Sequence, residues 1–261
     1  MTASEGKFGD LRARVLSGAA MALVGIAAVW AGGLVFVVLV CALCGAMVWE
    51  LMRMLHPSPP GRAAGEGLGA ALSLFLVATF MEPPAALAVM MVLAAGLSWA
   101  GRAHRLWRVG YTVLILLAGL GLILLRQDYG AIWVLWLVVL VIGSDVAGYF
   151  AGRIIGGPKL WPRVSPKKTW SGTVAGWGLA ALIGWGFTGP LGAGAGLVAV
   201  SVLVAMAGQA GDIAESAIKR HAGVKDSSNL IPGHGGVLDR FDAMIAAALM
   251  VLVLALLGAL G

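Results

Sequence analysis

The chain has 261 residues, of which 60% are hydrophobic and only 11% are charged, and it carries a formal net charge of +6. Its mean hydropathy is +0.95. A soluble globular domain carries about 25% charged residues, so the composition excludes that class and indicates an integral membrane protein. We therefore expect an all-α polytopic membrane protein that forms a single membrane domain over residues 1–261.

The amino-terminal segment carries basic residues ahead of the apolar run 12–32, an order also found in cleaved export signals. However, this run is long enough to cross roughly 30 Å of hydrocarbon, and it leads almost directly into a second apolar run. We expect it to remain in the protein as the first transmembrane helix.

The second predicted span, residues 33–52, contains Cys41 and Cys44 in a CxxC arrangement. Thiols in such apolar surroundings behave as small hydrophobic groups, and thiolates are costly there. We expect both cysteines to pack in the core, and we predict neither a disulfide nor a zinc site.

Apolar runs separated by short polar or Gly/Pro turns give about nine transmembrane helices, with eight to ten compatible with the boundaries. The predicted spans are residues 12–32, 33–52, 67–81, 84–100, 110–126, 130–150, 172–188, 191–211 and 237–260. The glycine-rich stretch 189–200 would permit close helix packing within one chain or between chains.

The distribution of Lys and Arg predicts the topology. If the amino terminus is cytoplasmic, all of the 18 Lys and Arg residues except Arg126 fall on the cytoplasmic side, as the positive-inside rule requires. The carboxyl terminus then lies on the opposite side. The cytoplasmic set is Lys7, Arg12, Arg14, Arg53, Arg62, Arg102, Arg105, Arg108, Arg153, Lys159, Arg163, Lys167, Lys168, Lys219, Arg220, Lys225 and Arg240.

In the first three cytoplasmic loops, this basic face needs no further role than orienting the protein and attracting anionic headgroups. The segment 143–172 differs because Asp145 lies inside an apolar span. Ionised groups are expensive there, which makes Asp145 a functional candidate, with Tyr149 one turn further on. The alternative is a structural ion pair with Arg153, two turns away on the same helix face.

Three prolines, Pro158, Pro162 and Pro166, interrupt the basic part of this segment and break any helix. We expect an irregular segment here, whose free amides could meet an anion. The alternative is an ordinary basic cytoplasmic loop. The polar residues concerned are Ser165, Lys167, Lys168 and Thr169.

The segment 212–242 is richer in ionisable groups. Asp212, Glu215, Ser216 and Lys219 share one helix face by their spacing. Two acids and a hydroxyl suit a hard cation such as Mg²⁺, which prefers oxygen ligands, although they also suit a solvated helix end.

The last predicted span begins with Asp239, Arg240 and Asp242, after a loop that Pro232 and three glycines keep irregular. The two acids are again three residues apart. Both acid clusters fall on the same face of the bilayer, so we expect a joint metal site.

Within that loop, Gly233, Gly235 and Gly236 allow the backbone conformations of a phosphate-binding turn, although GHGG is not the Walker pattern. His234 has three open interpretations, as an acid/base group, a phosphate donor or a turn residue. Acids that suit a cation, set beside Lys and Arg, indicate an anionic substrate. Phosphoryl and nucleotidyl transfer need this kind of charge neutralisation.

The segment 216–242 resembles, position by position, the signature of the phosphatidate cytidylyltransferase family: SxxKR, KD and then PxHGGxxDRxD. The matching residues are Ser216, Lys219, Arg220, Lys225, Asp226, Pro232, His234, Gly235, Gly236, Asp239, Arg240 and Asp242. The stretches SDVAGYFAGR and KLWPRVSPKKTWSG are similar to the family's second motif, so the resemblance covers roughly residues 140–250. Ser171 departs from the acidic or amide residue expected there, and residues 1–130 receive no role.

The resemblance implies that phosphatidate and CTP give CDP-diacylglycerol and pyrophosphate, with Mg²⁺ as cofactor and a second metal or monovalent cation left open. Together with the acid placement, it implies that Asp212 and Asp239 ligate Mg²⁺, with Asp145, Glu215 and Asp242 in or near the metal shell. The residues expected at the triphosphate or lipid phosphate are Lys167, Lys168, Lys219, Arg220, Lys225 and Arg240. Ser216, His234, Gly235 and Gly236 are expected to line the site.

The partners expected are CTP, phosphatidate and membrane lipids, without nucleic acid and with a homodimer left open. We expect the active site at the cytoplasmic face of the plasma (inner) membrane. Two other functions compete: a cation- or proton-coupled transporter that uses Asp145, Asp212 and Asp239 as an ion path, and a CTP-dependent lipid kinase.

Overall fold

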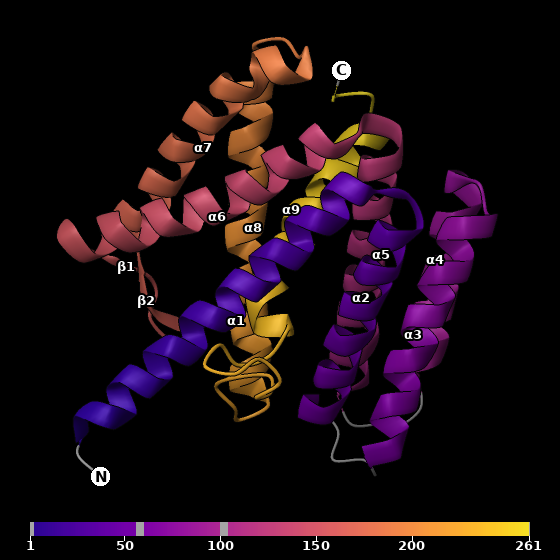
Figure 1. Ribbon diagram of the computed structural model, residues 1–261, viewed down its shortest axis with the longest axis horizontal. Coiled ribbons are helices and arrows are strands. Elements are labelled where there is room, and N and C mark those ends of the chain that lie inside the picture. Colours follow the sequence, from indigo (N-terminus) through magenta and orange to yellow (C-terminus); the bar gives the residue numbers. More distant parts are fainter. Residues whose placement is uncertain (1–2, 56–59, 100–103, 261) are drawn as a thin grey trace. The chain divides into compact units, whose positions relative to one another are not determined.

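The computed structural model describes residues 3–55, 60–99 and 104–260, and this part of the chain is mostly helical (Figure 1). Arg102 and the side chains of Lys7 and Arg12 lie outside what it describes. The elements are α1 (Ala3–Ala31), α2 (Gly33–Leu55), α3 (Pro60–Phe80), α4 (Pro83–Ser98), α5 (Arg105–Leu124), η1 (Leu125–Tyr129), α6 (Ala131–Ile154), β1 (Lys159–Trp161), β2 (Ser165–Thr169), α7 (Trp170–Leu191), α8 (Gly196–His221) and α9 (Leu238–Leu256).

Each of the nine predicted spans corresponds to one α-helix of the described residues. Seven of these helices, α1 to α3 and α5 to α8, are long and apolar enough to cross a membrane. Helix α4 has a shorter apolar stretch, Ala85–Ser98, and α9 carries three charged residues in its first turns. The chain is therefore an all-α polytopic membrane protein, as the composition predicts, while its orientation in the membrane stays a prediction.

Several residues expected in basic loops lie on helices instead. Arg108 is on α5 and has no exposed surface. Its guanidinium donates to Glu66 Oε1 of α3 at 3.2 Å and to Met52 Sδ of α2 at 3.1 Å. Arg108 thus joins three helices, because a buried guanidinium needs a carboxylate partner.

The described residues form two compact units, and each is considered by itself. The first unit contains residues 1–113 and 224–241, which means that a late segment of the chain completes the fold of the early helices. Helices α2 and α3 run side by side in it, with α4 against α3 (Figure 1). Gly45 and Gly67 lie at the α2–α3 contact, where an added Cβ on either would lie within 2.8 Å of the other's carbonyl oxygen.

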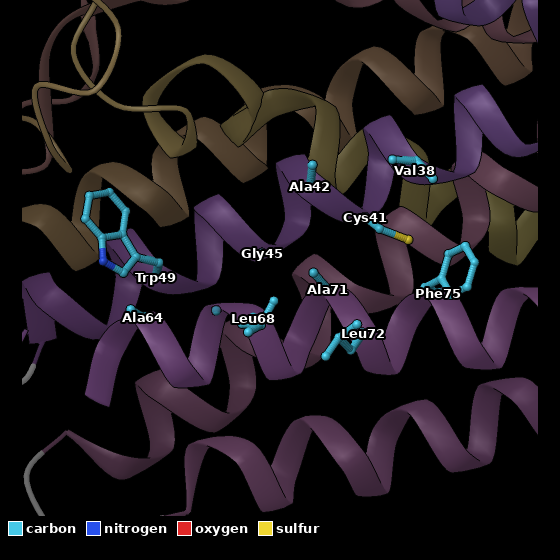
Figure 2. Close-up of a pocket in the computed structure, with 11 residues that line it drawn as sticks. Val38, Cys41, Ala42, Gly45, Trp49, Ala64, Leu68, Ala71, Leu72 and Phe75 are labelled. Atoms are coloured by element: carbon cyan, nitrogen blue, oxygen red, sulfur yellow. The ribbon is translucent and has the colours of Figure 1, made fainter. Parts of the chain in front are cut away.

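An open apolar groove of about 520 Å³ follows the α2–α3 contact. Figure 2 shows Val38, Cys41 and Trp49 of α2 along one side, with Leu72 and Phe75 of α3 opposite. Cys41 lines this groove, and both Cys41 and Cys44 are buried free thiols. Their burial agrees with core packing.

The second unit contains residues 114–223 and 242–261, in which α7 packs against both α6 and α8 (Figure 1). The close approach of α6 and α7 depends on Gly148 and Gly172, because a Cβ on Gly172 would overlap the carbonyl oxygen of Gly148. In contrast, a Cβ on Gly189, Gly192, Gly194 or Gly196 would meet open space, so within the described part of the chain these glycines of the stretch 189–200 make no close helix contact.

The expectation of an irregular segment at 165–169 is wrong. Residues Ser165–Thr169 form strand β2, which pairs antiparallel with β1 in the register Lys159 with Thr169 and Trp161 with Ser165. Thr169 then caps α7 by accepting the amide of Gly172 at 3.2 Å. The hairpin therefore holds Lys167 and Lys168 on a defined strand directly before a helix.

Candidate active site

The second unit brings the two motif segments into contact. Lys168 Nζ, on β2, lies 2.5 Å from Asp212 Oδ2, on α8. Both side chains are partly buried, which strengthens their attraction relative to a fully solvated pair. The ion pair links residues that the sequence places 44 positions apart. Within this unit, the segment 143–172 therefore contacts the first part of the segment 212–242 at Asp212.

The helix face predicted for Asp212, Glu215, Ser216 and Lys219 is confirmed. The hydroxyl of Ser216 donates to Asp212 Oδ1 at 3.4 Å, and Lys219 forms an ion pair with Glu215 one turn earlier. Glu215 has no exposed surface, whereas Asp212 is partly open. Of the two acids on this face, Asp212 is therefore the one that a ligand can reach.

Asp145 of α6 and Asp242 of α9 extend this cluster. Asp145 interacts electrostatically with Lys168 and Asp212, and Asp242 does so with Asp212, Lys219 and Asp145. Arg153 instead donates to the hydroxyl of Tyr149 at 2.8 Å. The alternative of a structural ion pair between Asp145 and Arg153 is therefore not the arrangement that the guanidinium of Arg153 adopts. We call Asp145, Lys168, Asp212, Glu215, Lys219 and Asp242 the acid–lysine cluster.

The donors of the acid–lysine cluster have the chemistry that Mg²⁺ prefers, because carboxylate oxygens are hard ligands and the neighbouring negative charges of Asp145, Asp212 and Asp242 favour an additional cation. Their oxygens fit Mg²⁺ in kind. Over the described ranges, however, no three His, Cys, Asp or Glu side chains are already arranged as a metal-binding group. The predicted ligands Asp212 and Asp239 fall in different units, each considered by itself.

The other predicted basic residues are more open to solvent. Lys167 is exposed on β2, next to the partly buried Lys168. Arg220 is exposed at the end of α8, Lys225 in the loop and Arg240 in the first turn of α9. Ser171, the position that departs from the family pattern, donates to the carbonyl of Gly156 and lies 3.0 Å from the hydroxyl of Thr169. Its hydroxyl thus supports the hairpin and the start of α7.

The first unit contains the rest of the motif, residues 224–241. Asp239 is 9% exposed, and its Oδ2 accepts hydrogen bonds from the amide of Ser227, the hydroxyl of Ser227 and the amide of Gly236 at 2.8–3.0 Å. Asp239 is a predicted metal ligand, and its Oδ2 is therefore engaged in hydrogen bonds to the loop 227–236.

His234 lies against α1. Its Nδ1 is 2.9 Å from the hydroxyl of Ser17, and the same hydroxyl is 3.0 Å from the carbonyl oxygen of Pro232. A Cβ on Gly18 would meet the imidazole ring at 3.6 Å. Ser17 therefore orients the ring through Nδ1, and all three interpretations of His234 remain compatible with this placement.

The loop is irregular, as expected, and Gly233 and Gly235 adopt φ values of 74° and 87°, which favour glycine. Its amides are directed at groups of the chain itself. Gly235 donates to the carbonyl of Ile231, Gly236 to Asp239, and Val237 and Leu238 to the carboxylate of Glu50 on α2.

Glu50 and Ser17 are the site residues that the sequence analysis missed, since it assigned no role to residues 1–130. For Glu50 a signal existed: the residue interrupts the apolar run LCGAMVWELM, and the argument that singled out Asp145 applies to it equally. For Ser17 the sequence offers no comparable signal.

Comparison with known proteins agrees with the motif. A family model described as "Cytidylyltransferase family" matches residues 12–257. A Pseudomonas aeruginosa protein named phosphatidate cytidylyltransferase is 35% identical over 258 residues, covering 82% of this chain and 85% of that protein. A Bacillus subtilis protein of the same name is 30% identical over 262 residues, covering 90% and 94%.

A Brucella suis protein, also named phosphatidate cytidylyltransferase, is 47% identical over 136 residues, and the chain spans about half the length of this relative (50%). The fold and the site thus define a class of protein: a polytopic membrane protein whose motif residues meet in an acid–lysine cluster. The chain belongs to the cytidylyltransferase family. The resemblance found in residues 140–250 is thereby confirmed, and it extends to the amino-terminal helices.

Proposed function

We propose that this chain is a phosphatidate cytidylyltransferase, which transfers CMP from CTP to phosphatidate and releases pyrophosphate. The relatives from Pseudomonas aeruginosa and Bacillus subtilis carry that name, and the signature in residues 216–242 matches the family at each fixed position. Apolar helices beside a polar cluster suit one lipid substrate and one soluble polyanion.

The observation that carries the proposal is the ion pair between Lys168 and Asp212. It gathers residues of both motif segments into the acid–lysine cluster, which offers cationic groups to phosphate and anionic groups to a metal ion. A transporter needs an ion path through the depth of the bilayer, whereas a nucleotidyltransferase needs both kinds of group at one place.

In the proposed reaction, an oxygen of the lipid phosphate attacks the α phosphorus of CTP. A P–O bond forms there while the bond to the β-phosphate oxygen breaks, and pyrophosphate leaves with that electron pair. The attacking group is already an anion, so the protein needs no strong general base. Its main task is to reduce repulsion between two anions and to align them.

For this task we assign to Lys168 and Lys219 the role of binding phosphate oxygens. Their ion pairs with Asp212 and Glu215 place both ammonium groups inside the cluster. Lys167, Arg220, Lys225 and Arg240 would attract CTP and the lipid headgroup from more exposed positions. Ser216 and His234 would line the site with polar hydrogen atoms, and Gly235 and Gly236 would shape the loop beside it.

Asp212 and Asp239 would hold Mg²⁺, with Asp145, Glu215 and Asp242 in or near the metal shell, because these carboxylates supply the oxygen ligands of a hard cation. Mg²⁺, when bound, neutralises triphosphate charge. A second metal or a monovalent cation stays open, as does a homodimer. Binding of a cation by Asp212 would free Lys168 from that carboxylate for a phosphate oxygen.

We further propose that the site faces the cytoplasm at the plasma membrane. This orientation follows from the distribution of Lys and Arg, and it gives CTP direct access from the cytosol while the acyl chains of phosphatidate stay in the bilayer. The amino terminus would then be cytoplasmic and the carboxyl terminus on the opposite side.

The test uses purified protein in detergent with phosphatidate and CTP labelled at the α phosphate, with and without Mg²⁺. We expect label in the organic phase that depends on phosphatidate and Mg²⁺. Asp212→Asn should lower turnover by at least about 100-fold, because it removes a charge that the transition state needs. Insertion and folding of the variant are checked by gel filtration.

Folded, metal-supplied protein that places no α-phosphate label in lipid would contradict the proposal. Label transferred instead from the γ phosphate would identify a CTP-dependent lipid kinase, and cation flux in liposomes without either transfer would favour the transporter.

A further inference from the structure

Glu50 is a buried acid in a helix to which the motif assigns no role. It lies on α2, and none of its surface is exposed. An ionised carboxylate in such a place is costly unless hydrogen bonds replace its hydration. The structure places four donor groups around it, two beside each oxygen, and one of them, the hydroxyl of Ser227, is shared with Asp239.

The four donors all come from the motif segment 224–241. Oε1 accepts from the hydroxyl of Ser228 at 2.5 Å and from the amide of Val237 at 2.9 Å. Oε2 accepts from the amide of Leu238 at 2.7 Å and lies 3.0 Å from the hydroxyl of Ser227. Glu50 thus binds both ends of the loop that contains His234.

The amides of Val237 and Leu238 lie at the amino-terminal end of α9, where the first backbone N–H groups have no partner within the helix. A carboxylate is favourable there because it also meets the positive end of the helix dipole. Glu50 therefore caps α9 from another helix, and it fixes the first turn that carries Asp239.

A hydrogen-bonded connection runs from Glu50 to Asp239 itself. The hydroxyl of Ser227 lies 3.0 Å from Glu50 Oε2 and 3.0 Å from Asp239 Oδ2, and the amides of Ser227 and Gly236 donate to the same Asp239 oxygen. The orientation of Asp239 thus depends on a loop that Glu50 holds in place.

The same contact explains the glycine at position 236. A Cβ there would lie 2.7 and 2.8 Å from the two oxygens of Glu50 and would overlap the hydroxyl of Ser227. The last glycine of the GHGG sequence is therefore required by the carboxylate of α2, independently of any phosphate.

We propose that Glu50 is a positioning residue of the transfer reaction: it holds residues 227–238 so that Asp239 and His234 meet the reacting groups in a fixed orientation. It acts through Asp239 and does not touch substrate. The proposal rests on the proposed function for its effect on turnover, and on the hydrogen bonds alone for its effect on the loop.

The test compares Glu50→Gln with wild type. The amide keeps the size of the side chain but places an NH₂ group against two donors. We expect kcat to fall about 10- to 100-fold, the usual range for groups that orient metal ligands, with KM for CTP changed much less. Hydrogen exchange followed by mass spectrometry should be at least about 10-fold faster at whichever of Val237 and Leu238 then faces the NH₂ group, because that amide loses its acceptor.

Glu66→Gln is the matched control. It is the same substitution in the neighbouring helix α3, where Glu66 pairs with Arg62 and the buried Arg108 and, among the described residues, forms no hydrogen bond or ion pair with the loop. We expect this variant to lower the melting temperature while leaving exchange in residues 224–239 and kcat unchanged. Glu50→Gln with wild-type kcat and unchanged exchange at Val237 and Leu238 would overturn the proposal.

If Glu50→Gln does not fold, Ser228→Ala decides, since it removes one donor and leaves three. Faster exchange in the loop with a several-fold lower kcat supports the positioning role, and wild-type values of both contradict it. If the wild-type protein transfers no CMP to phosphatidate, only the proposed function is contradicted. The exchange measurement still determines whether Glu50 holds the loop.

Discussion

Lys167 and Lys168 are neighbours on β2, yet they have different surroundings. Lys168 is partly buried and forms an ion pair with Asp212, whereas Lys167 is exposed. The sequence motif gives both residues the same role. The structure instead distinguishes a lysine within the cluster from one that contributes mainly to the local potential.

We predict that Lys168→Met lowers kcat/KM for CTP about 10- to 100-fold, the range expected when a charge-assisted hydrogen bond of about 1.5–3 kcal/mol is lost. Lys167→Met should cost much less, and raising the salt concentration should reduce its effect. Steady-state transfer assays at two ionic strengths check this. Equal losses in the two variants would contradict the distinction.

At the residue scale, the face of α8 was predictable because helical spacing alone puts Asp212, Ser216 and Lys219 together. Glu50 could have been singled out as an acid in an apolar run, but its partners could not, because they lie 177 to 188 residues later and no local pattern links them to it. Ser17 was not predictable either, because a serine in an apolar helix gives no sign of a histidine partner. Local periodicity finds pairs within one element, while contacts between distant segments need the fold.

At the scale of elements, hydropathy located all nine helices, because each needs an apolar run of fixed length. The hairpin at 159–169 was missed. Prolines exclude a helix, but they do not exclude a two-stranded hairpin, because both of its strands are edges and a missing N–H can face solvent. Pro166 lies within β2 in this way.

Glycine packing gives a prediction at this scale. Gly172→Ala should destabilise the protein by about 1–3 kcal/mol, because its Cβ would overlap the backbone of Gly148 and force α6 from α7. Gly178→Ala, on the same helix in open space, should change stability by less than about 1 kcal/mol and raise it if anything. Thermal unfolding in detergent, followed by circular dichroism, measures both. A stable Gly172→Ala variant would show that the helices can separate without cost.

At the scale of the whole molecule, the fold class followed from composition, whereas the division into two units did not. Residues 224–241 belong to the same unit as the first helices. Neither composition nor hydrophobic periodicity can show this, because both describe local sequence and not contacts between distant segments. The amino-terminal helices, which the motif leaves without a role, contribute Glu50 and Ser17 to the segment that carries the signature.

The predicted topology can be tested with single cysteines on two connections. Gly194→Cys lies between α7 and α8, and Asn229→Cys lies in the loop before α9. With a cytoplasmic amino terminus, an impermeant maleimide should label position 194 in intact cells and position 229 only after permeabilisation. Cys41 and Cys44 are buried and should react at neither stage. The opposite labelling pattern would reverse the orientation.

The pairing of Glu50 with a segment 177 residues further on also bears on how the protein is made. During synthesis, α2 enters the membrane long before Ser227, Val237 and Leu238 exist, and its carboxylate must stay hydrated or protonated in the meantime. The early helices can therefore insert one by one, but they reach their final packing only when the ribosome has completed the start of α9. A chain whose synthesis stops between these points would hold an inserted α2 in which the carboxylate of Glu50 has none of its four hydrogen-bond donors.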